Sequence, residues 1–179
     1  MRRIAVFGAS NPHPGDPAYQ SALTLGSLLG SAGYVVMSGG YIGTMEAVSR
    51  GAAEAGAHVI GVTCAEIENF RPGKANPWVK EELHTETIRE RIHTMMSTCD
   101  AALALPGGIG TLAEVALMWN HLLTGAISPR PLILIGSGWR ETVEAFYTGL
   151  GDYILAREHD WLDFAPDSQA AVERLQSIL

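Results

Sequence analysis

The run LPGGIGTLAE, from Leu105 to Glu114, carries the residue types best suited to chemistry. Gly107, Gly108 and Gly110 lack a Cβ, so the backbone there can come close to a ligand. The run joins an apolar strand to a helix, and amides at the start of a helix attract an anion such as phosphate. Glu114 follows about one turn into that helix. The run therefore predicts a phosphate-binding loop with a carboxylate beside it.

Two other interpretations of this run stay open from the residues alone. Thr111 and Glu114 are spaced as a capping box, in which each side chain bonds the backbone amide of the other residue. Glycine-rich turns between strands and helices also occur in α/β proteins that bind no ligand. A second loop of similar character, Ser38–Gly43, favours ligand binding.

Short apolar runs alternate with helical patterns along the chain, which is typical of a parallel sheet covered by helices on both faces. We therefore expect an α/β fold, a single Rossmann-like domain over residues 1–179. Strands are expected at Ile4–Phe7, Tyr34–Met37, Ala57–Thr63, Ala101–Leu105, Pro131–Ile135 and, at an edge, Trp161–Phe164. Helices are expected from Pro17 to Gly33, from Gly43 to Gly56, at Thr85–Thr98, from Gly110 to Leu123, at Gly138–Tyr147 and after Asp167 or Ser168, with a mobile loop at Cys64–Pro77.

In such sheets, ligands bind beyond the carboxyl ends of the strands. Three loops are expected there, namely Gly8–Pro12, Ser38–Gly43 and Pro106–Thr111. The first lacks the spacing Gly-x-Gly-x-x-Gly, and no acidic residue ends the second strand, so a dinucleotide is disfavoured. No Gly-Lys-Ser/Thr sequence is present, which excludes a Walker A loop. The pattern favours a mononucleotide or a sugar phosphate.

Composition narrows the classes of partner. The net charge of −7 without a basic stripe argues against nucleic acid as a partner. No apolar run approaches the roughly 20 residues of a membrane span, so no membrane partner is expected. The two cysteines and six histidines show no metal-ligand spacing, so we expect no metal. Two cysteines are too few for a disulfide framework, and we expect reduced thiols and a cytoplasmic location.

Arg89 and Arg91 precede the fourth expected strand and could bind phosphate or carboxylate through two parallel hydrogen bonds. Their spacing from Glu86 and Glu90 is equally typical of an exposed, solvated helix face. The residues alone do not decide between these interpretations.

The glycine run and the second loop together resemble motifs of the LOG-type family of cytokinin-activating enzymes, formerly labelled possible lysine decarboxylases. Pro106–Glu114 fits the family pattern Pro-Gly-Gly-x-Gly-Thr-x-x-Glu in full, and Ser38–Met45 is similar to Gly-Gly-Gly-x-x-Gly-Leu-Met. The beginning Phe7–Ser10 fits as well. The resemblance covers nearly the whole chain.

The resemblance implies hydrolysis of the N-glycosidic bond of a nucleoside 5′-monophosphate, such as AMP or a cytokinin-type nucleotide, to free base and ribose 5-phosphate. It implies Glu114 and Arg91 as the catalytic pair, without metal or organic cofactor. The substrate-binding residues then come from the three loops and the helix that follows: Ser10, Gly39, Gly40, Gly43, Met45, Gly107, Gly108, Ile109, Gly110, Thr111 and Asn120.

The chain departs from the family pattern at several positions. Ile92 stands where the family usually has Lys, Thr87 and Ala113 where it has acidic residues, and Ile109 where it has Tyr. These departures support an alternative, a non-catalytic carrier or sensor of a nucleotide or of molybdenum cofactor. Lysine decarboxylase activity is disfavoured, because the only lysines, Lys74 and Lys80, lie near an expected loop.

The helix after the glycine run is apolar around most of its circumference, so one side could face a second subunit. The resemblance implies a homodimer with sites near the subunit interface. Asn120 matches a family position that reaches the substrate from the partner, although an ordinary surface amide is an equal interpretation.

Overall fold

The apolar runs form a seven-stranded sheet, described by a computed structural model of residues 1–179. Every pair of neighbouring strands is parallel. The strands are β1 Arg3–Phe7, β2 Val35–Ser38, β3 Val59–Cys64, β4 Glu81–Thr85, β5 Ala101–Ala104, β6 Leu132–Ile135 and β7 Asp163–Ala165. The predicted fold class, a Rossmann-like parallel sheet with helices on both faces, is confirmed.

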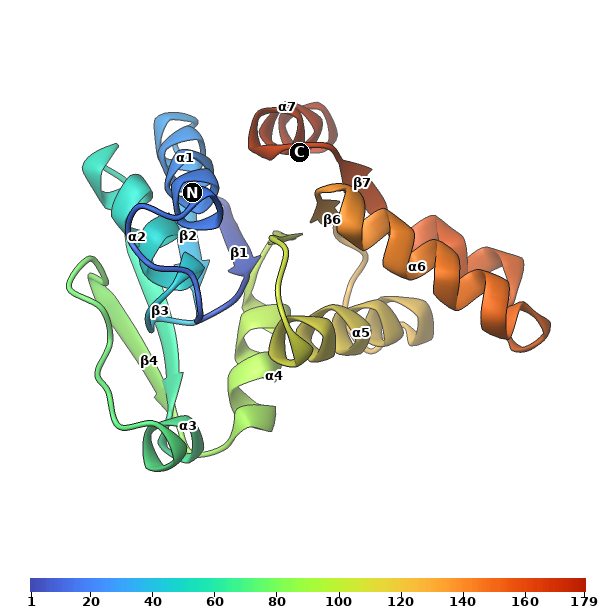
Figure 1. Ribbon diagram of the computed structural model, residues 1–179, viewed down its shortest axis with the longest axis horizontal. Coiled ribbons are helices and arrows are strands. Elements are labelled where there is room, and N and C mark those ends of the chain that lie inside the picture. Colours follow the sequence, from blue (N-terminus) through green and yellow to red (C-terminus); the bar gives the residue numbers. More distant parts are fainter.

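The helices form two layers, one on each side of the sheet (Figure 1). One face carries α1 Pro17–Ser31, α2 Thr44–Glu54 and α7 Ser168–Ile178, and the other carries α4 Ile88–Thr98, α5 Ile109–Thr124 and α6 Ser137–Leu150. The alternation of side chains along β1 shows how the core divides. Ile4 and Val6 pack under the first layer, whereas Ala5 and Phe7 pack under the second. Both faces of the strand are therefore buried.

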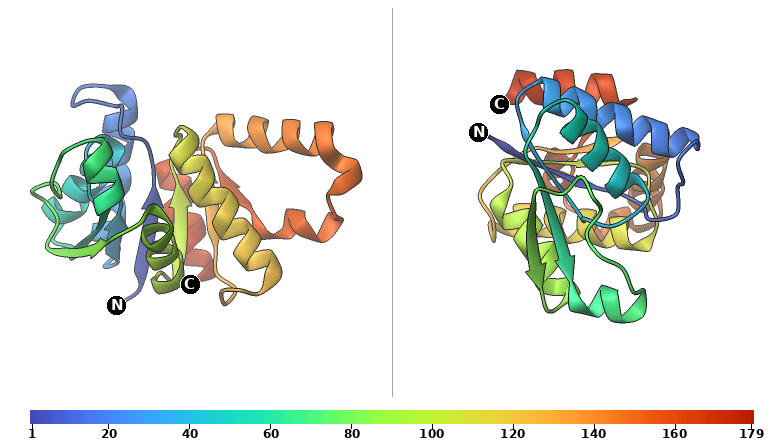
Figure 2. Two further views of the ribbon diagram at one scale, coloured as in Figure 1. Left: turned by 90° about the horizontal axis from the view of Figure 1, so that it is seen from below. Right: turned by 90° about the vertical axis from the view of Figure 1, so that its left-hand side faces the viewer.

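Two segments lie outside these layers. The short helix α3 Ala65–Phe70 connects β3 to β4 at one edge of the sheet. At the other edge, the 3₁₀ turns η1 Gly151–Tyr153 and η2 Ala156–Trp161 follow the far end of α6, which projects sideways from its layer, before the chain returns to β7 (Figure 2). No helix combines the length and the apolar character needed to cross a bilayer.

The strand order, β4-β3-β2-β1-β5-β6-β7, places the binding crevice. The chain runs outward from β1 to β4 and then returns to β5, which pairs with β1. Ligands of open α/β sheets bind at this change of direction, outside the carboxyl ends of the two strands. These strands end at Phe7 and Ala104, directly before the first loop and the glycine run.

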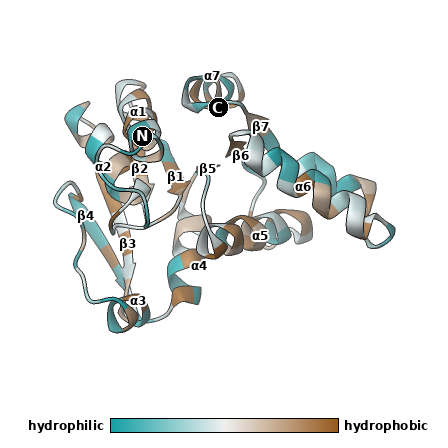
Figure 3. Cartoon of the chain, viewed as in Figure 1, coloured by the Kyte–Doolittle hydropathy of each residue, from teal (hydrophilic) through white to brown (hydrophobic).

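Several predicted elements were wrong in detail. Helix α3 forms within Cys64–Pro77, where a loop was expected, and β4 forms at Glu81–Thr85, where no strand was expected. EELHT is mostly polar because β4 is an edge strand, and Figure 3 colours it largely hydrophilic. Helix α4 begins at Ile88 and not at Thr85. The last strand occupies Asp163–Ala165, two residues later than expected at its start.

Candidate functional site

A pocket of about 380 Å³ opens at the carboxyl ends of β1 and β5. It receives residues from the loop after β1, from the starts of α2 and α5, and from α3 and α4. The lining residues are Gly8, Ala9, Ser10, Asn11, Tyr41, Met45, Ile67, Arg71, Arg91, Gly108, Ile109, Gly110, Thr111 and Glu114. Eight of the thirteen residues predicted for the site are among them.

The glycine run ends in an uncapped helix start that lines this pocket. Helix α5 begins at Ile109 after Gly108, without a side-chain cap, and its first backbone bond runs from the Leu112 amide to the Gly108 carbonyl. The amides of Ile109, Gly110 and Thr111 therefore have no acceptor in the protein. The capping-box interpretation of Thr111 and Glu114 is wrong, because both residues lie inside the helix. The free amides and the helix dipole favour an anion at this position.

Arg91 and Glu114 form a buried ion pair at the pocket, with 3.2 Å between Nη1 and Oε1. The exposed fractions of the two residues are only 5% and 7%. Arg91 also donates from Nε to the Val62 carbonyl at 2.6 Å and from Nη2 to the Gly39 carbonyl at 3.1 Å. Nη2 also faces Met45 Sδ, a weak acceptor, at 3.9 Å. One N–H on Nη1 therefore has no partner in the protein.

Burial raises the pKa of Glu114 from 4.5 to about 7, and the opposing attraction of the Arg91 guanidinium only partly offsets this rise. The cause is the cost of taking a carboxylate out of water. A carboxyl group with a pKa near neutrality can accept a proton at physiological pH and release it again. This is the property required of a general base.

The local fold explains why the pair can meet. Thr87 caps α4: its hydroxyl accepts from the Glu90 amide, while the Glu90 carboxylate accepts from the Thr87 amide. This capping box fixes the first turn of α4. From there the Arg91 side chain extends over the carboxyl ends of β2 and β3 to Glu114 on α5. Arg89, two residues earlier, is exposed and lies outside the pocket. The structure therefore separates the two arginines that the residue pattern left equivalent.

Gly39 and Gly43 allow the second loop to approach its neighbours. A Cβ on Gly39 would lie 1.9 Å from Arg91 Nη2, so no larger residue fits beside the guanidinium. Gly43 has φ +75° and a Cβ there would lie 2.4 Å from the Ala9 carbonyl oxygen. Through this contact the amide of Thr44 bonds Ala9 at 2.9 Å, which ties the second loop to the first.

Five predicted site residues do not line the pocket. Gly39, Gly40 and Gly43 shape the second loop behind it; the amide of Gly40 donates to Ser38 Oγ at 3.1 Å. Gly107 packs against Thr111, where a Cβ would lie 2.1 Å from Oγ1. Asn120 is exposed on α5, and within this chain it lies outside the pocket.

Six lining residues were not among the predicted site residues: Gly8, Ala9 and Asn11 of the first loop, and Tyr41, Ile67 and Arg71. The Tyr41 hydroxyl accepts from the Cys64 amide at 2.7 Å and donates to Glu68 Oε1 at 3.2 Å. Burial raises the pKa of Tyr41 to about 12. Ile67 and Arg71 come from α3 and its end. Because α3 has only six residues and no apolar periodicity, no local pattern indicates that this segment forms a wall of the pocket.

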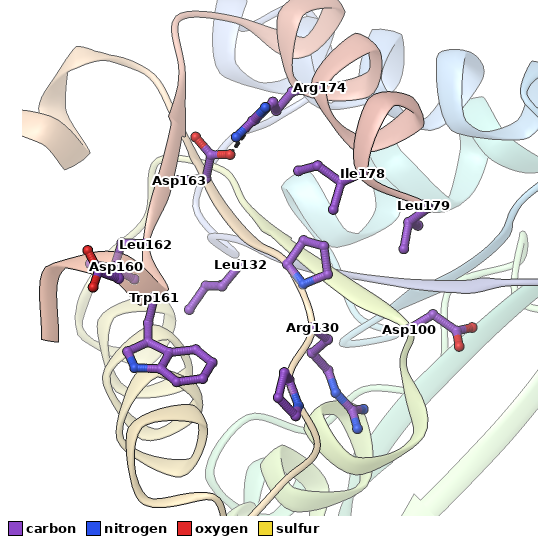
Figure 4. A pocket seen from close by; sticks show the side chains of 12 residues that line it. Asp100, Arg130, Leu132, Asp160, Trp161, Leu162, Asp163, Arg174, Ile178 and Leu179 are labelled. Carbon is purple, nitrogen blue, oxygen red and sulfur yellow. Dashed lines mark hydrogen bonds and ion pairs between the residues drawn. The ribbon is translucent and has the colours of Figure 1, made fainter. Parts of the chain in front are cut away.

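A larger pocket, of about 600 Å³, lies at the opposite, amino-terminal end of β5, β6 and β7 (Figure 4). Its arginines are already engaged. Arg174 pairs with Asp163 at 2.5 Å, and Arg130 donates to the carbonyls of Met96 and Cys99 at the end of α4. It contains none of the predicted site residues. The pocket at the carboxyl ends of β1 and β5, where the strand order changes direction (the switch point), is therefore the candidate site.

The strand order, the open helix start and the buried pair define a doubly wound α/β protein with a small-ligand pocket at its switch point. A model of the SLOG cluster4 family matches residues 1–141, and the chain belongs to this family. The resemblance to the LOG-type family is thereby confirmed.

Named relatives agree with this assignment. The chain is 31% identical to the rice (Oryza sativa subsp. japonica) protein named probable cytokinin riboside 5′-monophosphate phosphoribohydrolase LOGL9, over 98% of this chain and 78% of the rice protein. It is 29% identical to the Mycobacterium marinum protein named cytokinin riboside 5′-monophosphate phosphoribohydrolase, over 83% of this chain and 79% of that protein.

Among solved structures, the molybdenum cofactor binding protein of Rippkaea orientalis is similar, with a TM-score of 0.77 and 24% identity. The match covers 99% of this chain and 97% of that protein. At this level of identity the likeness concerns the fold.

Proposed function

We propose that this protein is a nucleoside 5′-monophosphate phosphoribohydrolase, which cleaves the N-glycosidic bond and releases free base and ribose 5-phosphate. The observation that carries the proposal is the buried Arg91–Glu114 pair beside the open start of α5. The names of the rice and mycobacterial relatives support it.

In this proposal the 5′-phosphate binds the free amides of Ile109, Gly110 and Thr111. The amides satisfy the phosphate oxygens, and the dipole of α5 adds to the attraction. Glu114 lies on the same helix, just beyond these amides. A phosphate fixed at the helix start therefore positions the ribose and its C1′ atom next to the carboxylate.

Glu114 then acts as general base. The bond between C1′ and the base nitrogen breaks and its electron pair passes to the base, so positive charge develops on the ribose ring. The oxygen of a water molecule bonds to C1′ while Glu114 accepts a proton from that water. The departing nucleobase takes up one proton from solvent, and Glu114 afterwards releases the proton it accepted to solvent, so one water molecule is consumed in each turnover. The ionised carboxylate also stabilises the positive ring.

Arg91 has a positioning role in this scheme. Its bonds to the Val62 and Gly39 carbonyls fix the guanidinium, and the guanidinium in turn orients the Glu114 carboxylate. The remaining N–H on Nη1 can bind a substrate oxygen. Arg91 thus holds the Glu114 carboxylate in place and also faces the nucleotide.

Incubation with AMP and isopentenyl-AMP, followed by chromatography of the released base, tests the proposal. We expect Glu114→Gln to lower turnover by about 10²–10⁴-fold, the usual contribution of a general base, while the nucleotide still binds. Arg89→Ala, an exposed change on α4, should leave activity unchanged. If the wild type releases base from none of a panel of nucleotides, the proposal is rejected.

A second candidate function is a non-catalytic carrier of a nucleotide or of molybdenum cofactor. The fold of the Rippkaea orientalis protein supports it, as does Ile92, which is buried in the core where the family pattern has Lys. For this candidate we expect strong thermal stabilisation by a ligand without turnover. Turnover by the wild type would exclude carriage as the main role.

We infer that the protein acts as a homodimer built on α5. Leu112 is 40% exposed, and Ala113, Ala116 and Asn120 are exposed on the same helix. Small exposed residues would let a second helix approach closely. Asn120, which lies outside the pocket of its own chain, would then be available to the site of the partner.

A further inference from the structure

Arg71 is the one charged side chain in the pocket that the proposed mechanism does not use. It lines the pocket, is half-buried, and forms no ion pair and no side-chain hydrogen bond. Glu68, three residues earlier on α3, accepts instead from the Tyr41 hydroxyl. Five N–H donors of Arg71 therefore remain for a ligand.

The sequence around Arg71 explains how it reaches the pocket. Pro72 follows it, and a residue before proline is pushed out of the helical region into extended backbone. Arg71 has φ −139° and ψ 95°, so α3 ends at Phe70. Pro72 thus ends α3 beside the pocket and leaves Arg71 in the pocket lining.

Arg71 and the free amides line the pocket from different elements, because Arg71 directly follows α3 whereas the amides begin α5. Glu114 on α5 contacts Arg91, and the Arg91 Cζ lies 5.7 Å from the centre of the Tyr41 ring. The Tyr41 hydroxyl in turn bonds Cys64, the residue before α3. In Figure 1, α3 and α5 are drawn on opposite sides of α4.

This order matches the order of groups in a nucleotide. Phosphate at the start of α5 and C1′ at Glu114 leave the base directed toward Tyr41, Ile67 and Arg71. Ile67 offers an apolar surface for the flat base, and Arg71 offers donors to its edge.

We propose that Arg71 determines base specificity and selects 6-oxopurine nucleotides over adenine nucleotides; this inference rests on the proposed function. Arginine donates hydrogen bonds and accepts none. A 6-oxopurine presents two adjacent acceptors, O6 and N7, which the guanidinium fork can bind together. Adenine presents an N6 amino donor beside N7, so one arm of the fork would face another donor.

IMP and AMP form the matched substrate pair, because they share the ribose 5′-phosphate and N7 and differ only at position 6 and in the hydrogen on N1. We expect the wild-type kcat/KM to be roughly 5- to 150-fold higher for IMP, the range typical of one bidentate contact. Arg71→Ala should remove most of this advantage and leave the AMP value nearly unchanged. Arg71→Lys keeps the charge without the fork and should retain only part of the preference. Arg89→Ala serves as the control.

Two outcomes would overturn the inference. One is a wild type that prefers AMP. The other is an Arg71→Ala variant that loses IMP and AMP activity equally, which would assign Arg71 to the phosphate. Calorimetry measures the affinities of the same variants for IMP and AMP and so tests the preference independently of turnover. Failure of hydrolysis with an intact, Arg71-dependent preference for IMP in binding would therefore reject the proposed function alone.

Discussion

At the scale of single residues, Glu114 carries a conflict between stability and chemistry. Its pKa is about 7 in the folded protein and 4.5 as a free group. Between these values the folded state keeps a proton that the unfolded state has lost. Stability from this group therefore falls as the pH rises from about 4.5 to 7 and is constant above that range. The ionised form that the mechanism requires is the form that burial disfavours.

We predict that Glu114→Gln is more stable than the wild type at pH 8, by up to roughly 3 kcal/mol, the free energy equivalent of the shift from 4.5 to about 7. The difference should vanish near pH 4.5, where both side chains are neutral. Urea unfolding at pH 4.5, 6 and 8 measures it. Glu144→Gln, an exposed change on α6, should show no such trend. A difference that is independent of pH would contradict the prediction.

Catalysis should depend on pH in the opposite direction. Because general-base action needs the ionised carboxylate, we expect kcat/KM to increase with pH and to level off above an apparent pKa of about 7. Initial rates of ribose 5-phosphate release between pH 5 and 9 provide the measurement. A profile that is flat across pH 6 to 8 would mean that Glu114 does not act as the base.

Gly39 is a residue whose absence of a side chain is itself functional. A methyl group there would lie 1.9 Å from Arg91 Nη2 and 2.4 Å from Met45 Sδ. Gly39→Ala should therefore displace Arg91, lower stability by about 1–3 kcal/mol through overpacking, and reduce activity by about 10²-fold through misplacement of Glu114. Gly149→Ala, with nothing within 4 Å, is the control for both measurements. Equal behaviour of the two variants would refute this role.

At the scale of elements, the first turn of α4 holds Arg91 in place. Thr87→Ala removes the capping hydroxyl and should lower stability by about 0.5–2 kcal/mol. We expect a decrease in Tm of roughly 1–8 °C, together with reduced activity because the start of α4 frays near Arg91. Ser97→Ala, near the other end of α4, should change neither. Circular dichroism melts and the base-release assay distinguish these results.

The helices and strands differ in how well they could be predicted from the sequence. The central strands are continuous apolar runs, and the glycine run marks the start of α5, so the fold class and the residues of that loop could be predicted from local pattern. The edge strand β4 could not, because EELHT is polar where one edge meets solvent. Nor could α3, which has no buried residue and is tied to the fold by polar contacts of Glu66 with Ile88 and of Glu68 with Tyr41.

The candidate site was less accessible to sequence analysis than the fold. Arg91 and Arg89 have similar sequence surroundings, and only the three-dimensional position of α4 buries the first and exposes the second. The position of Tyr41 depends on its hydrogen bond to Cys64. The position of Arg71 depends on where α3 ends. Pro72 was a local signal that a helix would end at Arg71, but only the fold shows that this end borders the pocket.

At the scale of the whole molecule, the exposed side of α5 predicts assembly. A chain of 19.1 kDa that pairs through α5 should have twice that mass by light scattering. A stable interface usually buries at least about 1,200 Å², so a charge placed at its centre should disrupt it. We predict that Ala116→Glu yields a monomer that stays folded, since this position is exposed in the single chain. Gln176→Glu on α7 adds the same charge elsewhere and should leave the mass unchanged. A wild type that is monomeric at all concentrations would rule out the dimer, and an active Ala116→Glu monomer would show that each site is complete within one chain.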